Sequence, residues 1–386
     1  MTVEGSSRDF SRSADPAALE VSVLTAPDAL DEIPADQWDA LVDALPRPSP
    51  YLLHGWLVSR ARHALGASVP RFHVAWRAGR LVGALPLEIV RHAGFRIGRF
   101  AAGPSATWLD VMLAQGEPVT TARELVVSAR NAGCDFYHLD GIAHDALVGE
   151  IGDLGMVARF ENCRFDFGRG WDVVYREVVS KRHRQDYQRK RRLLGERGRL
   201  ETRVARSAEE LGAVLDETFR LHELRWRGHY DASRYASAPT RLAMAEAVQR
   251  LAARDSYRIV TVELDGRPIA FLSVFILRGS AIGHRTAFDP AFGDYSPGAL
   301  VFFDAFEACE AEGVVRFEFG GGADQYKHRL ADDWELVYDA VGLVRGVRGA
   351  LGAATLKQVL RQRQRMQKST RMRAVYKRGR DLVYSR

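Results

Sequence analysis

A pattern that occurs twice limits what this chain can fold into more than any other feature of the sequence. The segment Gly79–Ala84 (GRLVGA) corresponds to Gly266–Phe271 (GRPIAF), 187 residues later. The segment Ala132–Tyr137 (AGCDFY) corresponds to Glu312–Phe317 (EGVVRF), 180 residues later. Because the two offsets nearly agree and the segments keep their order, the sequence indicates a duplicated domain.

Both copies predict the same series of elements: two helices, a hairpin, a strand, a helix and a final strand. Alternating apolar residues predict hairpins at 72–90 and 257–277. The next helices are expected at 120–132 and 296–312, and the first copy is also expected to form a strand at 108–113. The sequence therefore predicts an α/β protein (an α+β mixed sheet) with helices flanking the sheet in each copy.

The second of these helices begins with residues that can serve a ligand. Ser296 is suited to cap the helix with its hydroxyl group, and Pro297 then occupies the first helical position, where its missing N–H costs nothing. Gly298 leaves room for a ligand to approach the backbone. Free N–H groups and the helix dipole favour an anion such as a pyrophosphate, although an ordinary well-capped helix has the same residues.

Several motifs follow one another in the second copy. They are Ala287–Pro290 (AFDP), Tyr295–Gly298 (YSPG), Gly320–Gly322, Asp324 and the pair Tyr326-Lys327, and they are preceded by the basic segment 181–192. In this order they resemble the CelD/BcsL-type acetyltransferases. These enzymes carry the GNAT (acyl-CoA N-acyltransferase) fold and are related to the Fem peptidoglycan transferases. The resemblance covers about residues 20–345.

The resemblance implies two tandem GNAT-like domains that transfer an acetyl or longer acyl group from acyl-CoA, as co-substrate, to an amine or sugar. In that family a setting in surface-polysaccharide or cell-envelope synthesis is frequent. The expected division of the chain is a leader at 1–18, a first GNAT-like domain without cofactor at 19–170, a second GNAT-like domain with the acyl-donor site at 171–345, and a basic helical tail at 346–386.

The resemblance also assigns roles to residues of the second domain. The residues expected to hold the cofactor are Tyr295, Ser296, Pro297, Gly298, Ala299 and Lys327. Those expected in catalysis are Tyr326 as the acid, and His284 and Asp324 as candidate bases beside Glu318. Those expected to border the acceptor are His222, Glu223, Arg225 and Asp289. Core packing, a turn or a solvated surface is the structural alternative for each of these residues.

Charge is distributed unevenly along the chain, whose net charge is +6. Residues 345–386 contain thirteen Lys/Arg and one acid, and residues 176–206 contain twelve Lys/Arg and four acids, so the remaining residues are acidic overall. Such basic segments attract an anionic polymer, a membrane surface or cofactor phosphates, or they are simply solvated helix faces. Few aromatic residues lie among the basic ones, so a stable nucleic-acid complex is not expected.

The sequence does not suggest a metal site or a disulfide. The cysteines Cys134, Cys163 and Cys309 are widely separated, and no CxxC motif or His/Cys cluster accompanies them. The polar N-terminus and the shortness of all apolar runs favour a cytoplasmic protein, with peripheral contact to the inner membrane face as an open alternative.

Three functions remain open from the sequence. The first is the acyl-CoA-dependent transferase. The second is a Fem-like transferase that uses aminoacyl-tRNA; the basic segments favour it, but residues 227–240 are too few for an inserted helical arm. The third is an inactive double GNAT protein that binds an anionic polymer. Asp294–Ala299 has only one glycine of the Gln/Arg-x-x-Gly-x-Gly/Ala signature, which favours the third function, whereas Tyr326-Lys327 opposes it.

Overall fold

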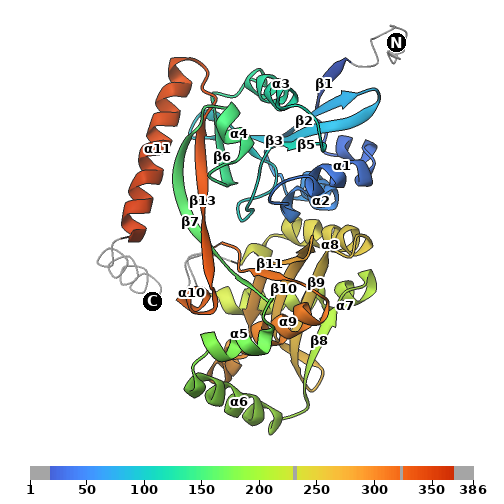
Figure 1. Cartoon of the computed structure of the whole chain (residues 1–386), viewed down its shortest axis with the longest axis vertical. Helices are drawn as coiled ribbons and strands as arrows, with labels where there is room; N and C mark the ends of the chain where they lie inside the picture. Colours follow the sequence, from blue (N-terminus) through green and yellow to red (C-terminus); the bar gives the residue numbers. More distant parts are fainter. Residues whose placement is uncertain (1–17, 229–232, 322–324, 369–386) are drawn as a thin grey trace.

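The computed structural model of the chain describes residues 18–228, 233–321 and 325–368 (Figure 1). The elements of the first half are β1 (Leu19–Leu24), α1 (Ala35–Asp43), α2 (His54–His63), β2 (Val69–Arg77), β3 (Arg80–His92), β4 (Phe95–Phe100), β5 (Met112–Leu113), α3 (Val119–Arg130), β6 (Phe136–Ile142), α4 (Leu147–Ile151) and β7 (Gly155–Asp166). The predicted leader lies almost entirely outside the described residues.

The second half begins with two helices that have no counterpart in the predicted order, α5 (Trp171–Val178) and α6 (Lys181–Gly195). They are followed by β8 (Leu200–Ala205), α7 (Ala208–Trp226), α8 (Ala238–Ala253), β9 (Tyr257–Leu264), β10 (Arg267–Leu277), β11 (Ser280–Phe288), the 3₁₀ helix η4 (Pro290–Tyr295), α9 (Pro297–Ala311), β12 (Arg316–Glu318), α10 (Gln325–Leu330), β13 (Asp333–Gly342) and α11 (Gly346–Lys368).

The strands form one sheet whose order has an internal symmetry. The order is β1-β2-β3-β4-β6-β13-β7-β12-β11-β10-β9-β8, and β5 pairs with β3 beside this path. From each end inward, four antiparallel strands lead to one parallel pair, β4 with β6 in the first half and β11 with β12 in the second. The structure therefore confirms the duplication and the α/β mixed sheet.

The two halves exchange their last strands. β13 lies between β6 and β7 of the first half, and β7 in turn pairs with β12 of the second half. Figure 1 shows β7 and β13 running side by side along the molecule, with α11 beside them. Leu360 and Ala353 of α11 are buried against Phe136, Val157 and Val341 of the sheet. The N-terminal part of the predicted basic tail therefore packs on the sheet.

The predicted strand at 108–113 is largely wrong. Trp108 has a φ of 60°, in the left-handed region, which interrupts an extended chain. Only Met112 and Leu113 form the short strand β5. The apolar residues of this segment are buried in a loop, so the alternation that suggested a strand reflects burial alone.

Helices α2 and α8 join the two halves outside the sheet, where Figure 1 shows them packed together. Gly55 of α2 allows a close approach, because a Cβ at this position would lie 2.7 Å from Cβ of Arg250. Ion pairs add to the contact: Arg250 lies 3.2 Å from Asp31, and Glu246 lies 2.8 Å from His63. The relative position of the halves is thus fixed both by shared strands and by helix packing.

In the described part of the chain, no helix is both long enough and apolar enough to cross a bilayer.

Candidate active site

The parallel strands β11 and β12 pair over only three residues and then separate. The last register pair is Ile282 with Glu318. Beyond it Gly320 has a φ of 68°, and a Cβ at this position would lie 2.7 Å from the carbonyl oxygen of Gly283. Because β11 continues to Phe288 without β12 beside it, backbone groups of β11 are left unpaired along one edge in the middle of the sheet.

A β-bulge in β11 falls on the predicted base His284. Ser273 of β10 pairs with Arg285, and Val274 pairs with Gly283, so His284 has no partner in the register. Bulges of this kind redirect a side chain next to an active site. Nδ1 of His284 lies 2.8 Å from the hydroxyl group of Tyr257. Burial, together with the charge of Arg285, lowers the pKa of His284 well below its ordinary value, so the ring is neutral at neutral pH.

Aromatic residues from both halves surround this histidine. The rings of Tyr51 and Trp56, which belong to the first half, lie 6.1 and 5.3 Å from the ring of His284. The ring of Phe275, from β10, lies 5.0 Å away. Both halves therefore build the environment of His284.

The next residue, Arg285, also reaches the first half. Its Nη2 donates to Oγ of Ser105 at 3.3 Å, and its Nη1 donates to the carbonyl oxygen of His284 at 3.1 Å. Among the described residues, no carboxylate lies within 4.0 Å of this guanidinium, which is partly buried. Its charge acts on neighbouring side chains. Burial, and to a smaller extent the positive charge of Arg285, lowers the pKa of His222 to about 4.

Glu318, the last residue of β12, is held by donors that come from far along the sequence. Its Oε2 accepts from Nε1 of Trp108 at 2.6 Å and from Nδ2 of Asn162 at 2.7 Å. Asn162 is fully buried, and its Oδ1 has no hydrogen-bond partner. The contact between Glu318 and Trp108 joins the two halves at the point where β11 and β12 separate.

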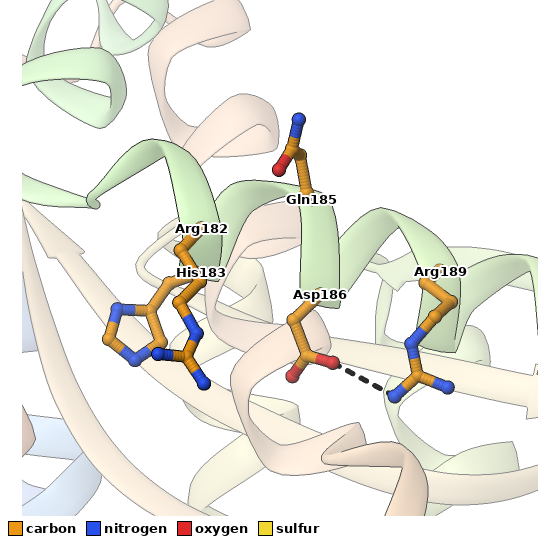
Figure 2. Close-up of a pocket in the computed structure, with 5 residues that line it drawn as sticks. All are labelled: Arg182, His183, Gln185, Asp186 and Arg189. Carbon is orange, nitrogen blue, oxygen red and sulfur yellow. Dashed lines mark hydrogen bonds and ion pairs between the residues drawn. The ribbon is translucent and has the colours of Figure 1, made fainter.

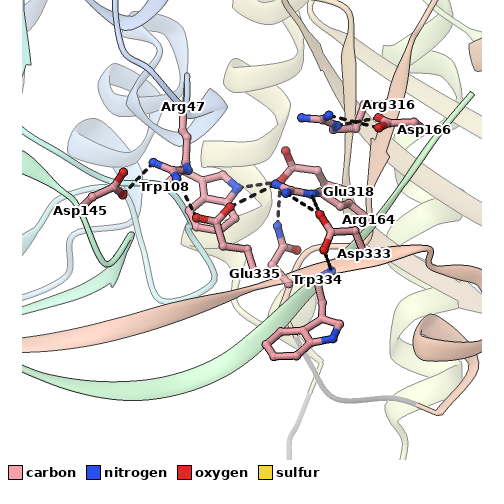
Figure 3. A network of polar contacts seen from close by, with 11 residues as sticks. Arg47, Trp108, Asp145, Arg164, Asp166, Arg316, Glu318, Asp333, Trp334 and Glu335 are labelled. Carbon is pink, nitrogen blue, oxygen red and sulfur yellow. Dashed lines mark hydrogen bonds and ion pairs between the residues drawn. The ribbon is translucent and has the colours of Figure 1, made fainter. Parts of the chain in front are cut away.

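Figure 3 shows this contact within a wider polar network. Arg47 of the first half pairs with Asp145 and with Glu335 of β13, both at 2.8 Å. Arg164 of β7 pairs with Asp333 at 2.6 Å and with the same Glu335 at 3.1 Å. Salt bridges therefore connect Arg47 of the first half to the exchanged strands β7 and β13.

The start of α9 differs from the predicted cap. Ser296 has a φ of 53° and makes no capping hydrogen bond, so the predicted capping by its hydroxyl group is wrong. In this left-handed conformation the hydroxyl instead accepts from Nζ of Lys190 in α6, at 2.9 Å. Pro297 is the first helical residue, as predicted. Gly298 is partly exposed, and a Cβ at this position would lie 3.0 Å from the ring of Phe288.

Basic residues of the second half gather beside this helix start. Nη1 of Arg197 donates to the hydroxyl group of Tyr295 at 2.8 Å, and its guanidinium lies 5.6 Å from the centre of the same ring. Lys190 also pairs with Asp186 at 3.0 Å. The predicted cofactor residues Tyr295–Ala299 therefore lie next to two cationic side chains, Lys190 and Arg197.

Figure 2 shows a surface pocket along α6. Its lining residues are Arg182, His183, Gln185, Asp186 and Arg189. Asp186 accepts from Arg189 at 2.9 Å, as the dashed line shows. Hydrogen bonds from Lys190 and Arg189 lower the pKa of Asp186. The pocket is therefore a charged surface groove.

The predicted acceptor residues fall into two groups. His222 is buried and lies near His284, with Nδ1 2.7 Å from Oγ of Ser233. Arg225 is close to Phe288, with its guanidinium 5.2 Å from the ring centre. The other two residues make local contacts: Glu223 pairs with Arg241, and Asp289 caps η4 through the N–H of Ala291 at 3.0 Å.

Three predicted residues follow β12. Asp324 lies outside the described residues, and Tyr326 belongs to α10, but its side chain is also outside the described part. Lys327 is buried, and its Nζ donates to the carbonyl oxygen of Gly321 at 2.7 Å. Among the described residues, no group of three His, Cys, Asp or Glu side chains is placed to hold a metal ion.

The sequence analysis did not identify the residues that the first half contributes. Trp108, Tyr51 and Ser105 belong to segments without a recognisable motif. Asn162 lies in β7, a strand that the sequence analysis did not predict.

Comparison with known proteins identifies the second half. Residues 181–328 match the family model of the acetyltransferase (GNAT) domain. A search of curated proteins finds no match.

Among solved structures, three similar ones align with most of the chain. FemX has a TM-score of 0.56 at 11% identity and aligns over 80% of this chain and 96% of its own. L-PGS from Bacillus licheniformis has a TM-score of 0.53 at 14% identity, over 86% and 97%. A conserved protein of unknown function from Bacteroides thetaiotaomicron has a TM-score of 0.54 at 11% identity, over 83% and 100%.

At these identities the similarity shows the fold alone. Together with the symmetric strand order, it establishes two tandem GNAT-like domains in a mixed α/β fold.

Proposed function

We propose that this protein is an acyltransferase that moves an acetyl or longer acyl group from acyl-CoA to an amine or sugar acceptor. The observation that carries the proposal is the match of residues 181–328 to the GNAT acetyltransferase model. This range contains α6, the start of α9 and the point where β11 and β12 separate. The motifs at 287–327 support the CelD/BcsL type, with a role in surface-polysaccharide or cell-envelope synthesis.

The start of α9 fits the pyrophosphate of CoA. The N–H of Gly298 donates to no acceptor among the described residues, and the residue is partly exposed. Lys190 and Arg197 add two positive charges from outside the helix. Backbone donors, the helix dipole and cations together favour a phosphate group. We propose that Tyr295–Ala299, with these two cations, hold the cofactor, and that Lys327 fixes the adjoining glycine loop.

When bound, acyl-CoA supplies a thioester whose carbonyl carbon accepts a nucleophile. The chain must hold the acceptor atom beside that carbon, take up its proton and return a proton to the sulfur atom as the C–S bond breaks. The unpaired edge of β11 is suited to orient the carbonyl group. The role of Tyr326 as the acid that protonates the sulfur stays a prediction.

For the base we propose Glu318. Two N–H donors fix its Oε2, while Oε1 accepts no hydrogen bond from the described residues and is left to take up a proton. His284 keeps a proton only well below neutral pH, and its Nδ1 is engaged by Tyr257. We therefore propose that His284 shapes the site as a neutral ring. Asp324 stays a prediction.

The proposal is tested by calorimetric titration with acetyl-CoA and longer acyl-CoAs. We expect saturable binding, and we expect Lys190→Glu to weaken it by about tenfold or more, because a repelling charge replaces a charge-assisted contact. Arg192→Glu is the matched control: this residue is on the same helix, is 72% exposed and pairs with Glu196, so its change should alter the Kd less than about twofold. No binding of any acyl-CoA would refute the proposal.

A Fem-like transferase that uses aminoacyl-tRNA is the second candidate function. The similarity to FemX in fold and the basic helix α6 favour it. The connection between α7 and α8 opposes it, since its described residues form only the short 3₁₀ helix Arg234–Ala236. Transfer of a radiolabelled amino acid from tRNA, without any thiol release from acyl-CoA, would favour this candidate over the first.

The basic segments 176–206 and 345–386 support a third proposal, contact with an anionic polymer or membrane surface. Arg361, Arg363 and Arg365 of α11 are exposed. Retention on heparin that falls steeply with salt is the expected result. Retention that does not change with salt would count against this contact.

A further inference from the structure

Among the described residues, Arg285 at the junction of the two halves has no acidic partner. Two nearby arginines are neutralised: Arg316 lies 2.7 Å from Asp166, and Arg164 lies 2.6 Å from Asp333. In the described part of the chain, the acceptors of Arg285 are the neutral oxygens of Ser105 and His284. A partly buried charge that meets only neutral groups is unfavourable unless an anion completes its surroundings.

Glu318 is the opposite charge at the same junction. Its donors Trp108 and Asn162 satisfy one carboxylate oxygen, and the fully buried amide oxygen of Asn162 has no donor at all. A buried oxygen without a donor is a site for an N–H group. Two oxygen acceptors, Oε1 of Glu318 and Oδ1 of Asn162, are therefore available to a cationic or N–H-bearing group.

Both charges contact the same loop of the first half: Arg285 donates to Ser105 at 3.3 Å, and Glu318 accepts at 2.6 Å from Trp108, three residues further along the chain. Arg285 also donates to the backbone carbonyl of His284, whose ring contacts Tyr51. In agreement, burial raises the pKa of Tyr51 to about 12, while Arg285 opposes this rise and Glu318 adds to it. The positive and negative groups therefore lie on one loop of the first half, beside β11.

We propose that the acceptor is a small amine that also carries an anionic group, a carboxylate or a phosphate. Its nitrogen lies at Glu318 and Asn162, and its anionic group lies on Arg285. This inference rests on the proposed acyltransferase function and names the class of its acceptor. A neutral amine or a neutral sugar would leave Arg285 without a counter-charge, so the site selects against both.

The same arrangement serves the transfer step. The ammonium group of the acceptor gives one proton to the carboxylate of Glu318 and becomes a neutral amine. Its electron pair forms the new N–C bond to the thioester carbon, and its second proton is lost as the C–S bond breaks with the electron pair on sulfur. The sulfur takes up one proton, so the products are an amide and free CoA thiol. Trp108 is a positioning residue that holds Glu318 from the first half.

The test compares acceptors in pairs that differ only in the anionic group. Phenylalanine against phenethylamine tests a carboxylate, and glucosamine 6-phosphate against glucosamine tests a phosphate. Thiol release from acetyl-CoA gives kcat/KM, and calorimetry in the presence of CoA gives acceptor binding. For at least one pair we expect the anionic member to be preferred by about 10- to 100-fold, the range of a charge-assisted hydrogen bond.

Two variants assign that preference to Arg285. Arg285→Gln should lower the kcat/KM of the anionic member by about 10- to 100-fold more than that of the neutral member, and Arg285→Lys should retain part of the preference. Arg316→Gln is the matched control, because this arginine is two residues from Glu318 but is already paired with Asp166. It should leave the preference intact.

The outcomes separate this inference from the proposed function. If the protein binds acetyl-CoA but uses both members of each pair equally, or binds no anionic member, the inference is wrong and the acyltransferase function stands. It is also wrong if Arg285→Gln lowers the kcat/KM of neutral and anionic members alike. If wild-type protein binds no acyl-CoA, the proposed function itself fails. Arg285→Gln should bind acetyl-CoA within about twofold of wild type, which shows that the variant is folded.

Discussion

The equivalent helices α3 and α9 begin in opposite electrostatic surroundings. At the start of α3 the chain supplies its own anion, because Glu117 accepts from Thr121 at 2.6 Å and from Arg77 at 2.8 Å. Burial raises the pKa of Glu117, but the hydrogen bonds from Arg77 and Thr121 lower it overall. At the start of α9 the charged side chain in contact is instead Lys190, which donates to Ser296 and pairs with Asp186. A carboxylate therefore contacts the first turn of α3, whereas a lysine contacts the residue that precedes α9.

The strands that follow these helices also differ between the two halves, in their length. β6 extends over Phe136–Ile142 and pairs with β13 along most of its length, whereas β12 ends at Glu318 after three residues. In the repeat, His138 is the counterpart of Glu318, and it lies 3.3 Å from Asp339 within a continuous sheet. The comparison teaches that duplication preserved the architecture, including a parallel pair that separates after two register pairs in the first half and three in the second, whereas the strand after the helix is short in the second half.

The largest effect is expected from Glu318→Gln. Losing a general base should lower kcat for acyl transfer by about 10²- to 10⁴-fold and leave the Kd for acetyl-CoA nearly unchanged. His138→Gln, the equivalent change in the first half, should alter kcat less than about twofold, because the ring of His138 is bound to Asp339 within a continuous sheet. Single-turnover thiol release measures both. Equal effects of the two changes would contradict the division of roles between the halves.

A second prediction concerns stability at low pH. Burial lowers the pKa of His73 in the first half and of His222 in the second to about 4, from an ordinary value of 6.5. Because folding favours the neutral ring, the contribution of each buried histidine to stability is complete above pH 6.5 and is lost as the pH falls towards 4. Each histidine should then lower the free energy of unfolding by about 3 kcal/mol between these limits.

Urea unfolding of wild type, His73→Asn and His222→Asn between pH 7 and pH 4.5 measures these contributions. Each variant should lose less stability than wild type over this range, because asparagine does not titrate there. A difference from wild type that stays constant with pH would show that the histidine is not buried as a neutral ring.

The smallest effect is expected from two tryptophan changes. Trp108→Phe removes the indole N–H that holds Glu318, so kcat should fall by about tenfold while KM for the acceptor changes little. Trp38→Phe removes a similar hydrogen bond, from Nε1 to the carbonyl oxygen of Leu52 at 2.8 Å, inside the first half. It should lower the free energy of unfolding by about 1 kcal/mol and leave kcat unchanged. A lower kcat in both variants would indicate a general loss of packing.

Local signals in the sequence predicted much of the fold correctly. Ser207 and Glu210 have the three-residue spacing of a capping box and form one at the start of α7, and Pro297 opens α9 as predicted. Gly133 and Gly313, which follow α3 and α9, have a positive φ, the conformation that glycine commonly adopts after a helix. These features depend on residues within one or two turns, so the residue types alone specify them.

β7 was missed for a reason that its residues explain. Arg159, Asn162 and Arg164 interrupt its apolar pattern, and each donates a hydrogen bond to a group from another part of the chain. The predicted strand at 108–113 failed in the opposite way, since its apolar residues are buried without forming a strand. Burial and polar pairing at these positions depend on distant segments, which the local pattern does not contain.

The sequence by itself determined the duplication, the α/β class and most of the helices and hairpins, whereas the cofactor site at Tyr295–Ala299 stays a prediction. Only the tertiary structure decided the exchange of β7 and β13, the left-handed turn at Ser296 and the contact of Glu318 with Trp108. The physical reason is separation along the chain: Trp108 and Glu318 are 210 residues apart, and they meet only because both halves share one sheet.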